Sequence, residues 1–341
     1  MEVYFGNNFW NHRHKGRAGR KVELHQSFEW DGYPWLIPAA YLCSKGLVLD
    51  FCKQIPKQRI QSLMDRWEEK AKQKQISQEE HELLEFENPM GDLIHFKASM
   101  NGRIAEGISM CSVCWNPLLQ KEAQEAKEVN ELVEEYQCDQ EQGWQFTRAA
   151  IPWPYKRRPE KVSLTLNIKP YTLPYPCGQH FTVSMEDSSR QILVTHPVSN
   201  NQYTLYISGM QSEELPEKTF QRLGSYEFPK HFVRLGYHFD QESAYSEFTI
   251  NDCVQSDRPR PIPVQEGEAV SYDCAASVGI IGGVSAAFTL EQEQESQLRE
   301  QYAISSLHFE PVQQVEWRIS ALIKRGEEIA LELPMIIREE S

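Results

Sequence analysis

The sequence lacks a long run of apolar residues. Its most apolar stretch, SVGIIGGVSAAF at 277–288, is shorter than the roughly 20 residues that a helix needs to cross a bilayer. The start of the chain, MEVYFGNNFWNHRHKGR, has no apolar core of the kind found in a secretory signal. These two absences predict a protein without a membrane anchor, and we expect it to be cytoplasmic.

The chain also has no excess of positively charged residues. The chain has 35 Lys and Arg against 49 Asp and Glu, for a formal net charge of −14. The mean field around such a chain repels phosphate, which disfavours nucleic acid and anionic membranes as partners. We therefore expect the partner to be an unknown protein or a small-molecule ligand.

The common catalytic signatures are absent as well. There is no phosphate loop, no Gly-x-Gly-x-x-Gly and no His-Glu-x-x-His. The stretch GGVSAAF around Ser285 lacks the final glycine of a nucleophile elbow, and we interpret it as a tightly packed strand. No motif singles out a thiol–imidazole pair such as Cys274 with His238 or His308. The sequence thus predicts no cofactor and leaves open whether the protein is an enzyme.

Strand patterns are abundant. In KVSLTLNI, residues 161–168, Val162, Leu164, Leu166 and Ile168 fall on one face, which is the alternation of a half-buried strand. The polar residues at 199–201 and Gly326 are predicted to form hairpin turns. Further strands are predicted at 180–185, 191–194, 203–207, 315–323 and 328–333.

Helix signals are fewer. An apolar stripe between Ile60 and Ala71 has helical spacing. The segment SQEE, with Ser77 and Glu80, is a capping box that predicts a helix to about residue 87. Asn116 and Pro117 can open a helix that reaches Tyr136, and a fourth, acidic helix is predicted at 289–303.

Helices therefore gather in the first half of the chain and strands in the second. This segregation predicts a β-rich α+β fold rather than a parallel sheet. We expect an N-terminal mixed domain with two to three helices over residues 1–155. An antiparallel β-sandwich or barrel follows over residues 156–341.

Eight cysteines are spread through the chain, which is long enough to fold without disulfides. In the cytoplasm we expect them to be reduced. Four potential ligands occur in pairs, in CSVCW at 111–115 and PCGQH at 176–180. Zinc takes four such ligands, so Cys111, Cys114, Cys177 and His180 could form one site in a zinc enzyme or a zinc-stabilised module.

The two pairs are separated by 62 residues, which is wider than the usual spacing in zinc fingers and ribbons. We therefore interpret the pairs as coincidental and predict no metal. A redox role for Cys111 and Cys114 is a further alternative.

The interpretation that we favour is a binding or interaction protein. The segment HRHKGRAGRK at 12–21 is strongly basic for an acidic chain, and we expect it in an exposed loop or hairpin tip. Aromatic rings among prolines and charges, as in FEWDGYPW at 28–35 and IPWPYKRRP at 151–159, are predicted in loops that suit ligand surfaces. The predicted ligand-binding residues are Trp10, Arg13, Lys15, Arg17, Arg20, Trp30, Trp35 and Trp153.

Overall fold

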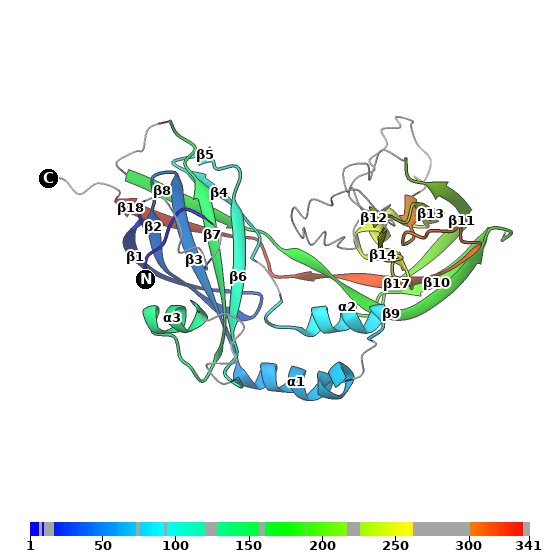
Figure 1. The fold of residues 1–341 in the computed structure, drawn as a ribbon, viewed down its shortest axis with the longest axis horizontal. Helices are drawn as coiled ribbons and strands as arrows, with labels where there is room; N and C mark the ends of the chain where they lie inside the picture. Colours follow the sequence, from blue (N-terminus) through cyan, green and yellow to red (C-terminus); the bar gives the residue numbers. More distant parts are fainter. Residues whose placement is uncertain are drawn as a thin grey trace, which may run out of the picture. The chain divides into compact units, whose positions relative to one another are not determined.

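A computed structural model describes most of the chain, and antiparallel strands dominate it (Figure 1). Trp10, Arg13, Lys15, Ser285 and the greater part of the predicted helix at 289–303 lie outside the described residues. So does Cys274. The described residues are 1–6, 9, 17–72, 76–91, 94–119, 128–156, 161–187, 189–216, 226–261 and 301–336.

The chain forms two compact units, and neither is one continuous stretch of sequence. Unit 1 comprises Met1–Ile76, Leu84–Leu173 and Lys324–Ser341, and unit 2 comprises Ser77–Leu83 and Pro174–Ile323. Residue 155, where the sequence predicts a domain boundary, lies inside the second segment of unit 1.

Unit 1 contains a five-stranded antiparallel sheet in the order β1-β2-β3-β7-β6. Asp31 and Gly32 join the first two strands with φ angles of 51° and 70°, the left-handed conformation that a tight hairpin turn requires. The strands are β1 (Arg20–Trp30), β2 (Tyr33–Leu42), β3 (Gly46–Ile55), β6 (Ser109–Trp115) and β7 (Gly143–Pro152).

A second sheet of unit 1 has the order β18-β8-β4-β5. The alternation predicted for 161–168 is confirmed, because Val162, Leu164, Leu166 and Ile168 are buried. They share one apolar core with residues of the first sheet such as Leu49. The strands are β4 (Phe96–Met100), β5 (Arg103–Ile104), β8 (Lys161–Ile168) and β18 (Ile329–Ile336).

Three α-helices occur in the described part of the chain: α1 (Lys57–Lys72), α2 (Gln78–Glu87) and α3 (Glu128–Glu135). The prediction of a helical mixed domain at the N-terminus does not match, because β1, β2 and β3 precede α1. For the helix predicted from Asn116, the described residues show a turn at 117–119 and helix α3 from Glu128 onward, and residues 120–127 lie outside the described part of the chain. None of the described helices is long and apolar enough to cross a membrane.

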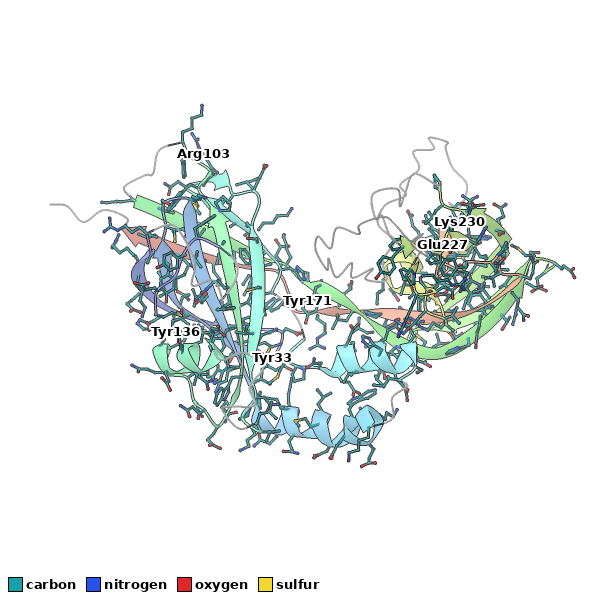
Figure 2. The ribbon with its side chains drawn as sticks, in the orientation of Figure 1. Tyr33, Arg103, Tyr136, Tyr171, Glu227 and Lys230 are labelled. Atoms are coloured by element: carbon teal, nitrogen blue, oxygen red, sulfur yellow. The ribbon has the colours of Figure 1, made fainter. Side chains whose placement is uncertain are left out.

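Local contacts explain where α2 begins and how α3 packs. The capping box is confirmed, since Ser77 Oγ accepts a hydrogen bond from Glu80 N at 3.1 Å and Glu80 Oε2 accepts one from Ser77 N at 3.0 Å. Helix α3 buries Leu132 in a cluster with Phe146 of β7. Tyr136, labelled in Figure 2, follows α3 and belongs to the same cluster.

Unit 2 has a four-stranded sheet, β10-β11-β13-β16, and a three-stranded sheet, β14-β17-β9. The hairpin predicted around 199–201 is confirmed as the β10–β11 pair. Among the described residues the structure contains no closed barrel. The strands are β9 (Tyr171–Ser184), β10 (Arg190–Thr195), β11 (Gln202–Glu214), β12 (Tyr226–Glu227), β13 (His231–Phe239), β14 (Phe248–Asp252), β15 (Arg260–Pro261), β16 (Gln301–Ile304) and β17 (Gln314–Arg325).

The hairpin predicted at Gly326 is wrong. β17 pairs with β14 and β9, whereas β18 pairs with β8. Gly326 has the positive φ of a turn, 66°, but the strands on its two sides belong to different sheets. Three elements contribute residues to both units, namely α2, β9 and β17.

Candidate metal centre

The sheet β14-β17-β9 of unit 2 has an apolar face and a polar face. The odd-numbered residues of β17 from 315 to 321 lie in the apolar core. Side chains alternate along a strand, so Glu316, Arg318 and Ser320 point to the opposite face. In β9, Phe181 belongs to the core and its neighbour His180 joins the polar face.

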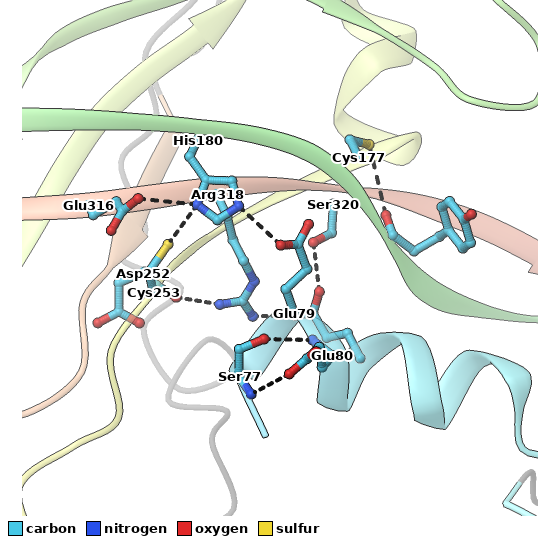
Figure 3. A network of polar contacts seen from close by, with 12 residues as sticks. Ser77, Glu79, Glu80, Cys177, His180, Asp252, Cys253, Glu316, Arg318 and Ser320 are labelled. Atoms are coloured by element: carbon cyan, nitrogen blue, oxygen red, sulfur yellow. Dashed lines mark hydrogen bonds and ion pairs between the residues drawn. The ribbon is translucent and has the colours of Figure 1, made fainter. Parts of the chain in front are cut away.

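The first residues of α2 contribute acidic side chains to this polar face (Figure 3). Glu82 accepts a hydrogen bond from Ser320 Oγ at 2.8 Å and forms an ion pair with Arg318. The side chains of Arg318 and Glu82 are only 5% and 8% exposed. Arg318 also donates to the backbone carbonyl of Asp252. This buried pair therefore holds the backbone next to Cys253.

Cys253 is the residue after β14, and a backbone hydrogen bond to β17 fixes its position. Its N–H donates to the carbonyl of Glu316 at 2.9 Å, which extends the pairing of Asp252 with Trp317. The Asp252 carboxylate accepts a hydrogen bond from the N–H of Ser306 at 2.7 Å. Burial raises the pKa of Asp252, and the bonds from Ser306 oppose this effect.

His180, Cys253 and Glu316 bring three potential metal ligands together. His180 Nδ1 lies 3.3 Å from Glu316 Oε1 and 3.5 Å from Cys253 Sγ. The three ligand atoms all lie within 4.8 Å of one another. In a tetrahedron with bonds of roughly 2.0–2.3 Å, neighbouring ligand atoms are about 3.3–3.8 Å apart. The two distances from Nδ1 fall in this range.

Both imidazole nitrogens of His180 face a carboxylate: Glu316 lies 3.3 Å from Nδ1, and Glu79 lies on the other side of the ring. Glu79 Oε2 lies 3.3 Å from His180 Nε2 (Figure 3). A carboxylate can only accept a hydrogen bond, so Glu79 and Glu316 compete for the ring proton of a neutral His180. A metal ion bound at Nδ1 would leave the proton on Nε2, where Glu79 accepts it. Metal-bound histidines are commonly held by such a carboxylate.

The Cys253 thiol is a poor nucleophile as it stands. Burial, and secondarily the negative charge of Glu316, raise its pKa to about 11, so the reactive thiolate is scarce at neutral pH. The side chains of His180 and Glu316 are 34% and 56% exposed. Three protein ligands at an exposed position leave room for a fourth ligand from solvent.

The paired cysteines predicted from CSVCW do not meet. Cys111 and Cys114 both lie within β6, opposite Arg148 and Gln145 of β7, and not in a tight turn. Three residues apart on a strand, they point to opposite faces. Cys111 packs beside the apolar cluster under α3, and Cys114 Sγ donates to the carbonyl of Met90 at 3.6 Å. One ion cannot bind both thiols in this arrangement.

PCGQH also lies in a strand, β9, where Gly178 has a φ of 67°. Burial raises the pKa of Cys177, whose Sγ donates to the carbonyl of Tyr175 at 3.8 Å. Of the four paired residues, only His180 belongs to the cluster of three ligands. The seven described cysteines are thiols and not disulfides.

Sequence reasoning missed Cys253, Glu316 and Glu79. The only signal is the alternation of β17, which places Glu316 on a polar face. The sequence gives no indication that residues 79, 180, 253 and 316 lie close together in the fold.

The predicted aromatic residues lie in unit 1. Trp30 ends β1 and Trp35 lies in β2, and they are only 4% and 3% exposed. Trp30 Nε1 donates to the carbonyl of Glu327 at 2.7 Å. The prediction that these two rings lie in loops is therefore wrong. Trp153, just after β7, is half-buried and donates to the carbonyl of Cys43 at 3.1 Å.

Arg17, Arg20 and Lys21, the described cations of the basic segment, are exposed. Arg17 precedes β1 and Arg20 begins it. Next to them, Lys21 forms ion pairs of 2.8 Å with Glu135 and 2.9 Å with Glu23, so one cation of the segment has structural partners. A binding role for the segment stays a prediction.

No protein-family model, no curated protein and no solved structure matches this chain. The chemistry of the cluster formed by His180, Cys253 and Glu316 is therefore the basis for the functional proposal.

Proposed function

We propose that the protein binds one divalent transition-metal ion, with zinc as the best match, through His180 Nδ1, Cys253 Sγ and a carboxylate oxygen of Glu316. The observation that carries the proposal is the orientation of His180. Nε2 lies 3.3 Å from Glu79, and Nδ1 lies 3.3 Å from Glu316 Oε1 and 3.5 Å from Cys253 Sγ. An ion bound at Nδ1 leaves the ring proton on Nε2, where Glu79 accepts it.

The ligand types select the class of ion. Thiolate, imidazole and carboxylate together are typical of zinc and related transition metals. Calcium and magnesium prefer sites made only of oxygen atoms. A soft sulfur ligand in the set thus argues against both of these ions.

The position of the ligands suggests what the ion does. They come from β9, from the residue after β14 and from β17, so one ion cross-links three neighbouring strands. Its binding energy adds to the folding energy of unit 2. A bound zinc also supplies a Lewis acid with an open fourth position, as in zinc sites that hold three protein ligands and a water.

The test is a zinc titration of the full chain, followed by metal analysis after gel filtration. We expect about one zinc ion per chain. Cys253→Ser and His180→Ala should each lose the ion after dialysis. Cys177→Ser is the matched control, because Cys177 is a half-buried thiol three residues from His180 on the same strand. It should retain zinc.

Cobalt gives a second readout. Cobalt(II) bound to a thiolate adds a charge-transfer band in the near ultraviolet, which Cys253→Ser should remove and Cys177→Ser should keep. Circular dichroism spectra of the metal-free variants must match the wild type, so that loss of metal is not loss of fold. Zinc that stays bound to Cys253→Ser, or a wild-type chain that takes up none, contradicts the proposal.

A further inference from the structure

A second feature of unit 2 lies on the outward face of its four-stranded sheet. The register between β11 and β13 shifts between Ile207 and Gly209, and Gly209 then pairs with Gly236. Gly209 has a φ of 141°, and no heavy atom lies within 4 Å of where its Cβ would be. Two glycines opposite each other thus leave a patch of sheet without side chains.

Polar and aromatic side chains border this patch. They enclose a depression of about 210 Å³. Tyr302 of β16 lies opposite Gly236 and is 49% exposed. The Arg234 guanidinium lies 4.5 Å from the centre of the Tyr302 ring. We call this depression the glycine groove; it is bordered by Ser208, Gly209, Gln211, Arg234, Gly236 and Tyr302.

The groove carries little net charge. Arg234 Nε lies 2.9 Å from Glu213 Oε1, and an Arg234 Nη2–H donates to Gln211 Oε1 at 2.9 Å. The cation is therefore balanced by a carboxylate, and one of its Nη2–H donors is held by Gln211. A charged ligand finds no unpaired opposite charge here, so a neutral ligand fits better.

The face continues with aromatic rings. Tyr206 pairs with His238 in the ladder, and their rings stack with centroids 4.7 Å apart and an interplanar angle of 2°. His238 is two residues beyond Gly236, so it projects from the same face. The backbone of Gly209 and Gly236 is thus bordered by aromatic rings and by groups that donate and accept hydrogen bonds.

We propose that the glycine groove binds one neutral sugar ring. A pyranose combines an apolar C–H face, which packs on an aromatic ring, with a rim of hydroxyls that both donate and accept. Tyr302 offers the ring, and Ser208, Gln211 and Arg234 offer the polar partners. A few well-placed polar groups beside aromatic surface are typical of small-molecule sites.

Two other occupants fit less well. A peptide adds to a sheet at a free strand edge, but β11 and β13 are inner strands, paired on both sides. A nucleotide carries phosphates, which the net charge of −14 repels. An uncharged nucleoside is the remaining competitor, and the experiment includes it.

The test is saturation-transfer NMR with the full chain. The probes are methyl glycosides of glucose, galactose, mannose and N-acetylglucosamine, with adenosine as the competing class. A single ring on a shallow site should bind with a Kd of about 1 mM or weaker, since few atoms are buried. Binding of at least one glycoside in preference to adenosine supports the proposal.

Variants locate the site. Tyr302→Ala should weaken binding at least tenfold, and Ser208→Trp should block it, because Ser208 is exposed at the bulge. Tyr226→Ala is the matched control, since Tyr226 is 51% exposed in the same unit and borders no part of the groove. It should bind like the wild type.

Three outcomes overturn the proposal: no glycoside binds, adenosine alone binds, or Ser208→Trp binds a glycoside as well as the wild type does. The groove shares no residue with the metal ligands. Repeating the saturation-transfer measurement with Cys253→Ser separates the two proposals, because this variant should keep sugar binding.

Discussion

His180 Nε2 lies 3.3 Å from the Glu79 carboxylate, and the two residues come from segments of unit 2 that are far apart in sequence. The strand supplies the imidazole and the first turn of α2 supplies its acceptor. Zinc-bound histidines have acceptors of this kind, and losing one typically lowers metal affinity by about 10–100-fold.

Glu79→Gln should therefore weaken zinc binding by about 10–100-fold without abolishing it. The variant keeps the shape of the side chain but loses the negative charge that holds Nε2–H. Competition against a chromophoric chelator measures the affinity. Glu80→Gln is the control: it makes the same charge change in the same turn, and glutamine preserves the capping box. An equal loss in both variants would indicate a general charge effect.

Arg318→Met should strongly destabilise unit 2. It leaves the carboxylate of Glu82, which is 8% exposed, buried without its cation. Breaking a buried ion pair in this way costs about 3–5 kcal/mol. Denaturant unfolding measures the change.

Two further variants test the cause. Arg66→Met breaks an ion pair between α1 and Glu87, where the arginine is 61% exposed, and should cost no more than about 1 kcal/mol. The double variant Arg318→Met/Glu82→Met removes both buried charges and should recover more than half of the loss. No recovery would mean that the pair is not the source of the stability.

Gly326→Ala should destabilise unit 1 by about 1–3 kcal/mol more than Gly102→Ala. Both glycines have positive φ angles, 66° and 79°, so alanine is strained at each by about 1–2 kcal/mol. A Cβ at Gly326 would lie 2.6 Å from ring atoms of Trp30, whereas none lies within 4 Å at Gly102. Equal losses in urea unfolding would show that Trp30 moves away freely.

Unit 1 should lose stability at alkaline pH. The hydroxyls of Tyr41 and Tyr136 lie 2.9 Å apart, and Tyr136 donates to Asp50 Oδ2 at 2.6 Å. Burial raises the pKa of Tyr41 to about 12 and that of Tyr136 well above its usual value of 10. The unfolded chain releases these protons near pH 10, so their stabilisation is complete below pH 10 and declines as the pH rises toward 12.

Urea unfolding at pH 8 to 12 measures this decline. Tyr41→Phe has no proton to release at this position, so its stability should fall less steeply above pH 10. Tyrosinate absorbance of the folded wild type should likewise lag behind that of the unfolded chain. A wild type and a variant with parallel pH dependence would contradict the assignment to Tyr41.

Local features of the fold are readable from the sequence. The alternation of Val162, Leu164 and Leu166 locates β8, and Ser77 with Glu80 locates the start of α2. The sequence does not show in the same way which strands pair with one another. β8 pairs with β18, and β17 pairs with β14 and β9; these choices depend on long-range packing. Gly326 is an example. The sequence predicts its turn conformation, but it does not predict that the strands before and after it belong to different sheets.

The candidate metal site was predictable only through His180. Spacing suggested a partner in Cys114, but an extended strand separates Cys111 and Cys114 onto opposite faces. Cys253 and Glu316 become neighbours through a backbone bond between β17 and the residue after β14. A motif search detects ligands that are near one another in sequence, and this cluster draws each ligand from a different strand.

The pairing of β8 with β18 has a consequence for synthesis on the ribosome. Residues 161–168 leave the exit tunnel early, but their partner is not made until residues 329–336. At about 5–20 residues per second, one edge of β8 waits on the order of ten seconds for its partner. Throughout this time its N–H and C=O groups and its valine and leucine side chains are open to other nascent chains. Chaperones that bind nascent chains therefore have a defined target in this strand.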